Sequence, residues 1–172
     1  MRAFRLVWLL HRWIGVGIGL VLLVTASTGF LLLMKKEWAW VQPPVVRGEA
    51  GPASALKPLQ DVYAAVFALG LSEFRSEDDI ARIDFRPAQR VHKVVSVHDQ
   101  VEVQVCATTL RTSGPNRRVS DLLEQIHDGS WFGSVAHSGV MPIAAASLVF
   151  LAISGYVMWL WPKWQRRKSR VR

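Results

Sequence analysis

Acidic residues are absent from both ends of this 172-residue chain. All 13 Asp and Glu lie between Glu37 and Asp128. On either side of that region runs a 22-residue, largely apolar stretch, Trp13–Met34 and Val140–Trp161. At a rise of about 1.5 Å per residue, each stretch forms a helix of roughly 33 Å, enough to cross a hydrocarbon core of about 30 Å. The sequence therefore predicts two membrane spans flanking one extramembrane domain.

The distribution of basic residues predicts the orientation. Nine of the 21 Lys and Arg lie outside the spans at the chain ends, whereas residues 35–128 carry the other twelve together with all 13 acids. Because Lys and Arg concentrate on the cytoplasmic side of membrane proteins, we expect both termini in the cytoplasm and the central domain across the membrane. The formal net charge of +8 then reflects topology, and no nucleic-acid partner is expected.

A cleavable signal peptide is the alternative for the first segment, because basic residues precede it and small residues end it, Thr25–Gly29. Its apolar part is longer than the roughly 7 to 15 residues of a signal-peptide core, and no clean Ala-x-Ala site follows. We therefore predict a retained helix. Three regions result: 1–37 with the first span, 38–128 as the soluble domain, and 129–172 with the second span and a basic tail.

The start of the central domain is set by a change in composition. Prolines and glycines make residues 41–55 a predicted linker, so we expect the fold to begin near Leu56. Apolar residues at helical spacing then predict one helix over Leu59–Leu69 and another over Val119–Ile126.

Three runs that alternate with period two predict strands at 80–85, 91–97 and 101–106. They indicate an antiparallel meander packed on the helix that precedes them. Thr112–Pro115 is predicted to be a turn. The predicted class is thus an α+β membrane protein, with two transmembrane helices and a small domain of about 70 residues, marginal in size for an independent core.

The central domain shows no catalytic signature. Cys106 is the single cysteine, so an intrachain disulfide and a closed Cys-based metal site are excluded, and burial or a disulfide with a partner remain. His92 and His98 could share one strand face, but two imidazoles lack the further ligands that a metal site normally needs.

Histidines near the spans are the stronger functional candidates, because ionisable groups are costly there. His11 heads a helical face of small side chains that includes Gly15 and Gly19, and His127 and His137 precede the second span. The His137 face also carries small residues. Such faces permit close helix packing, of which Gly-x-x-x-Gly is the usual form, or leave room for a flat macrocycle with imidazole as axial iron ligand. Interfacial histidines that bind headgroups or cap helices are the alternative.

Two spans cannot easily surround a porphyrin or supply two axial ligands at each level. A two-fold symmetric homodimer can, because it sets each histidine against its own copy and forms a four-helix transmembrane bundle.

Three segments resemble the PepSY-associated transmembrane protein family. His11–Trp38 is similar to its first helix, with a His-Arg-Trp start, early glycines and Thr28-Gly29 near the far end. Asp121–Gly133 resembles its Leu-His-x-Gly element, with Ile126 in place of Leu. Ile153–Pro162 resembles its Ser/Thr-Gly-x-x-x-Trp ending, and the region between is similar to a PepSY domain.

The resemblance implies a bacterial inner-membrane protein with its domain in the periplasm, and b-type haem held by His11 and His127, two per dimer. His137 departs from the family pattern and is either a further ligand or an interfacial residue. The implied activity is reduction of periplasmic ferric iron or a ferric siderophore, with electrons from an unidentified donor. A non-enzymatic PepSY module that binds a partner, or an accessory subunit of a larger complex, is the alternative.

Overall fold

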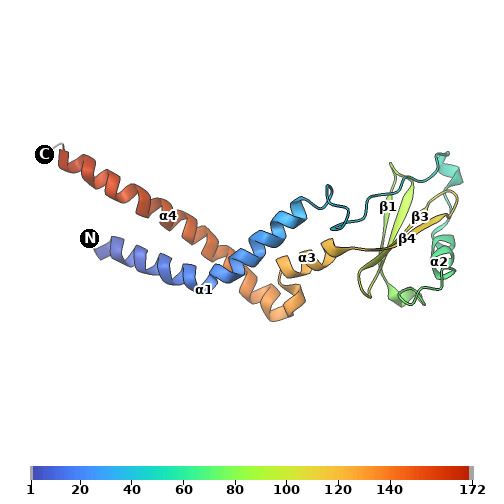
Figure 1. Cartoon of the computed structure of the whole chain (residues 1–172), viewed down its shortest axis with the longest axis horizontal. Coiled ribbons are helices and arrows are strands. Elements are labelled where there is room, and N and C mark those ends of the chain that lie inside the picture. The colour runs from blue at the N-terminus through green and yellow to red at the C-terminus, as the bar shows by residue number, and fades with distance from the viewer. Residues whose placement is uncertain (1, 171–172) are drawn as a thin grey trace. The chain divides into compact units, whose positions relative to one another are not determined.

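A computed structural model describes residues 2–170 of the chain, with side chains as far as Gln165. It divides into two units (Figure 1). One comprises the described residues up to Phe30 and from Leu123 onward, and the other is Leu31–Leu122.

Two long helices dominate the first unit, α1 (Arg2–Leu33) and α4 (Met141–Arg170). Both are long and apolar enough to cross a membrane, with mean hydropathies of 2.3 and 2.0 in their most apolar windows. Each extends past the predicted span, α1 at its start and α4 at its end. A π-helical turn, Ala136–Val140, precedes α4, and the helix continues through Pro162. The predicted tail ends in residues 171 and 172, which lie outside the described part.

The two long helices run antiparallel, so that the start of α1 and the end of α4 lie at the same end of the unit (Figure 1). The side chain of His11, early in α1, contacts Ser154, late in α4. One turn further along α1, a Cβ at Gly15 would lie 3.6 Å from the Leu151 side chain. The missing side chain at Gly15 therefore permits close packing of the two helices.

The second unit is built on a four-stranded antiparallel meander in the order β1-β2-β3-β4. Its first three strands, β1 (Ile80–Arg86), β2 (Val91–Ser96) and β3 (Val101–Cys106), confirm the predicted runs. Helix α2 (Leu59–Phe67) packs on one face of this sheet, as predicted. The core between them is apolar and consists of Val62, Val66, Phe74, Val94, Val101, Val103 and Val105.

The predicted turn at residues 112–115 is wrong. These residues begin the fourth strand, β4 (Thr112–Arg117), which contains a cis Gly114-Pro115 peptide bond. Glycine and proline here mark an edge strand, where proline's missing N–H costs no pairing bond. The predicted helix that follows is confirmed as α3 (Val119–His127).

The predicted linker at residues 41–55 is also wrong, because its first part packs on the sheet face opposite α2. Val41 is fully buried, and its carbonyl accepts the Ser120 N–H at 2.8 Å. The Gln104 side chain holds the backbone of this segment in both directions, accepting the Val46 N–H at 2.7 Å and donating to the Pro44 carbonyl at 2.9 Å. The folded domain therefore begins near Val41 rather than Leu56.

A network of charges lies on the same face of the sheet. Lys93 and Glu102 are essentially fully buried, and Lys93 Nζ lies 3.0 Å from Glu102 Oε1. Arg118 binds the other oxygen of Glu102 and donates to Asp121 at 2.9 Å. Arg82 completes the network by donating to Asp121 at 3.0 Å. Each buried charge thus has an opposite charge beside it, as burial requires.

Candidate cofactor site

His11 is oriented by a hydrogen-bonded chain that ends on α4. Its Nδ1 lies 2.7 Å from the Ser154 hydroxyl, and that hydroxyl donates to the Leu151 carbonyl at 3.2 Å. With its single proton on the Leu151 carbonyl, Ser154 Oγ accepts, and Nδ1 of His11 carries the proton in this arrangement. The lone pair of a neutral His11 is then on Nε2, the nitrogen with no hydrogen-bond partner among the described residues.

The His11 ring lies against a glycine. A Cβ at Gly155 would be 3.7 Å from Cε1 of His11, the ring atom between the two nitrogens. Beside Gly155, α4 carries an open hollow of about 380 Å³ lined by Leu151, Ala152, Gly155, Tyr156 and Trp159. Its volume is within the range of small-molecule and cofactor sites, and its lining is almost wholly apolar.

His127 is held in the same way at the other end of α1. Its Nδ1 lies 3.0 Å from the Thr25 carbonyl oxygen and 3.2 Å from Thr28 Oγ1. A carbonyl can only accept, so Nδ1 is the protonated nitrogen, and Nε2 again has a free lone pair. The ring lies against Gly29, where a Cβ would be 3.1 Å from Cε1.

The two sites share one local design. In each, a histidine Nδ1 bonds the hydroxyl of a Ser or Thr, and the ring covers the glycine that follows that residue, Ser154-Gly155 or Thr28-Gly29. A metal-binding histidine normally donates its other N–H to such an oxygen, which fixes both tautomer and orientation. His11 and Thr28 are 17 residues apart on α1, or about 26 Å along the helix, so the two sites lie near opposite ends of a span.

His137 has a different surrounding. It lies in the π-helical turn, and its Nδ1 donates to the Asp128 carbonyl at 2.8 Å. Its side chain is 53% exposed and no glycine lies against its ring, yet its Nε2 also has no partner in the described part of the chain. Its role as a haem ligand stays a prediction.

The two glycines predicted to belong to the site, Gly15 and Gly19, differ in their surroundings. Gly15 lies at the helix–helix contact, whereas a Cβ at Gly19 would meet nothing within 4 Å. Gly19 thus borders open space that a flat ligand or another helix could occupy. Ser154 and Thr28 were not among the predicted site residues, although the Ser/Thr-Gly dipeptides could have pointed to them.

The two histidines of the soluble domain, His92 and His98, do not lie in a common site. His98 pairs with Asp79 at 3.1 Å, and His92 stacks on Phe85 with ring centroids 4.7 Å apart. Burial lowers the pKa of His92. Within residues 2–170, no group of three His, Cys, Asp or Glu is placed to hold a metal ion.

Comparison with known proteins gives one match. The family model described as PepSY-associated TM region matches residues 8–172, which include most of α1, the whole of α4 and the whole domain between them. No curated protein and no solved structure matches the chain. Because the match covers nearly its full length, the chain is a two-span membrane protein and belongs to the PepSY-associated transmembrane family.

Proposed function

We propose that this protein is a b-type haem protein of the bacterial inner membrane that passes electrons across the membrane to reduce ferric iron or a ferric siderophore in the periplasm. One observation carries the proposal. At each end of the helix pair, a histidine is fixed through Nδ1 by a hydroxyl, its Cε1 edge lies against a glycine, and its Nε2 has no partner among the described residues.

These residues fit haem better than a bare metal ion. A single imidazole at each level is too few ligands for a bare ion, whereas a porphyrin supplies four nitrogens itself and needs only axial ligands. When bound, haem supplies a one-electron Fe(III)/Fe(II) couple. His11 and His127 would hold it through Nε2, and Ser154 and Thr28 would keep both rings in the required tautomer.

In this proposal a second copy of the chain supplies a second imidazole at the His11 site and at the His127 site, which we call the His11 level and the His127 level. Among the described residues, neither Nε2 has a second imidazole opposite it. A two-fold axis along the membrane normal sets His11 against His11 and His127 against His127, which gives two haems per dimer and a four-helix bundle. The exposed apolar side chains along both helices, among them Leu20 and Leu23 at 73% and 63%, leave room for that contact.

The direction of transfer follows from charge. The basic chain ends favour the cytoplasm, so the His11 level faces the electron donor and the His127 level faces the periplasm. The separation of about 26 Å between the levels is close to the hydrocarbon thickness of about 30 Å, which favours two cofactors over one. The donor is unidentified.

The test is an absorption spectrum of the detergent-purified protein, oxidised and then reduced with dithionite, together with haem per chain. We expect a Soret band and reduced α-bands, with half the haem or more lost in His11→Ala and in His127→Ala. His98→Ala, in the soluble domain, is the matched control and keeps all of it. Reoxidation of the reduced protein by a ferric siderophore then tests the activity.

Two results contradict the proposal. A colourless protein from haem-replete cells favours a PepSY module that binds a partner. A chain that acquires haem only with another subunit favours the accessory role.

A further inference from the structure

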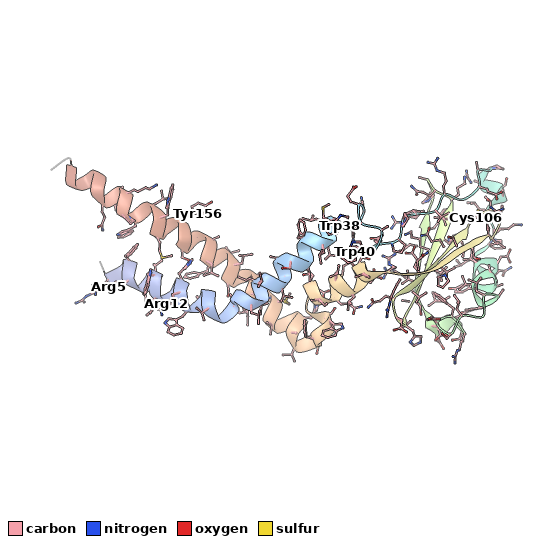
Figure 2. All side chains as sticks on the ribbon, viewed as in Figure 1. Arg5, Arg12, Trp38, Trp40, Cys106 and Tyr156 are labelled. Atoms are coloured by element: carbon pink, nitrogen blue, oxygen red, sulfur yellow. The ribbon has the colours of Figure 1, made fainter. Side chains whose placement is uncertain are left out.

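A second open hollow on α4 adjoins the one beside Gly155. It has a volume of about 680 Å³ and is lined by Trp159, Leu160, Lys163 and Trp164. Trp159 lines both hollows. Figure 2 shows Tyr156, which lines the first hollow, projecting from α4. Trp159 thus borders both hollows, and the first hollow also borders Gly155, against which the His11 ring lies.

Three residues that line the two hollows recur every four positions. Gly155, Trp159 and Lys163 are one helical turn apart and lie on the same side of α4. The distance from Gly155 to Lys163 is about 12 Å along the helix axis. Trp159 and Lys163 therefore lie one and two helical turns beyond the glycine that the His11 ring contacts.

Lys163 places a positive charge beside Trp159. Its Nζ lies 3.3 Å from the centroid of the Trp159 ring, so a cation–π contact holds the ammonium over that ring. Neither long helix contains an acidic residue, since every Asp and Glu of the chain lies between Glu37 and Asp128. A carboxylate partner for Lys163 must therefore come from outside the two spans.

We propose that Lys163 binds the carboxylates of the tetrapyrrole held by His11, and that Trp159 packs against its apolar part. The inference rests on the proposed function and names the residue that orients the cofactor. An ionised carboxylate is strongly disfavoured in hydrocarbon, so the carboxylate edge must face the membrane surface, where the ammonium of Lys163 lies. This cation thereby fixes which edge of the macrocycle points out of the membrane.

The test compares two ligands that differ only in those carboxylates. Apo-protein of full length, in detergent, is titrated with ferric protoporphyrin IX and with its dimethyl ester, and the Soret band is followed. The His127→Ala background isolates the His11 site, and the same titration in the wild-type background shows the effect in half of the bound haem if that variant is unstable. Lys163→Gln, Lys163→Arg and Arg5→Gln are compared. Arg5 lines a different hollow, with Phe4 and Trp161, and is the control for loss of one charge at the same membrane face (Figure 2).

We expect Lys163→Gln to weaken binding of the free acid about tenfold, the size of one charge-assisted hydrogen bond, and to leave binding of the ester unchanged. Lys163→Arg should keep the preference for the acid, and Arg5→Gln should have no effect. Equal loss for both ligands, or no loss, overturns the inference. Absence of a Soret band with either ligand contradicts the proposed function itself.

Discussion

His127 and Gly29 are in contact closely enough that the side chain at position 29 controls the imidazole. A Cβ at Gly29 would lie 3.1 Å from Cε1 of His127, shorter than ordinary packing allows. Substitution to Ala also favours the helix by about 1 kcal/mol, because glycine has low helix propensity. Stability and site geometry are therefore expected to respond in opposite directions.

The first prediction uses that opposition. Gly29→Ala should push the imidazole off its rotamer at a cost of about 1 kcal/mol and lower haem occupancy at the His127 level several-fold, without loss of helix stability. Gly17→Ala is the control, since a Cβ there would meet nothing within 4 Å. Haem per chain and the reduced α-band are the measurements. Equal haem in both variants would show that the ring does not ligate iron in this orientation.

The second prediction compares the contributions of the Ser154 and Thr28 hydroxyls to iron binding. Ser154 Oγ makes the one hydrogen bond to His11 Nδ1 among the described residues, so Ser154→Ala should lower iron affinity at that level about 10- to 100-fold. Thr28→Val should have the smaller effect, because His127 keeps the Thr25 carbonyl as acceptor at 3.0 Å. Titration with ferric haem measures both. The reverse order would refute the proposed roles of these oxygens.

The sequence predicted the elements and missed their contacts. Periodicity located β2, β3 and α3, because their apolar residues repeat at regular spacing even though β2 and β3 are buried on both faces. It failed at Val41–Glu49, where prolines and glycines signalled a linker, because Gln104 binds that backbone from 60 residues away. It also left Ser154 unnoticed, since the pairing with His11 spans 143 residues and no local pattern encodes it.

The third prediction concerns the buried charges of the domain. Glu102→Gln should destabilise the domain by about 3–5 kcal/mol, because it leaves Lys93 and Arg118 buried with less compensating charge. Replacing both Lys93 and Glu102 by Met should cost much less, since Arg118 keeps Asp121. Asp99→Asn is the control, because its pair with Arg117 is exposed and contributes less than about 1 kcal/mol.

Unfolding can be followed at one natural site. Cys106 is the single cysteine and is 7% exposed, so a thiol-reactive fluorogenic dye labels it when the domain opens. A Glu102→Gln domain that melts at the wild-type temperature would show that the ion network contributes no stability.

The last prediction concerns the acidity of that thiol. Burial by itself raises the pKa of Cys106, but hydrogen bonds from the Thr108 and Thr109 side chains and from the backbone of Thr108 and Glu49 outweigh it and lower the pKa to about 6. An unperturbed thiol titrates near pH 8.5. Between these values the unfolded chain binds more protons than the folded one, so the stability of the domain should rise with pH from about 6 to about 8.5.

Titration of the thiolate tests this directly. The ultraviolet absorbance of the Cys106 thiolate, taken as the difference between the native chain and Cys106→Ser, should reach half its plateau near pH 6, whereas in the denatured chain it should do so near pH 8.5. Thr108→Val removes a hydroxyl that lies 3.3 Å from Sγ, and should move the native midpoint upward. Cys106→Ser should abolish the rise of stability above about pH 7.5, because the other lowered pKa, that of His92, affects stability only up to about its ordinary value of 6.5. A native midpoint equal to the denatured one would mean that these donors do not stabilise the thiolate.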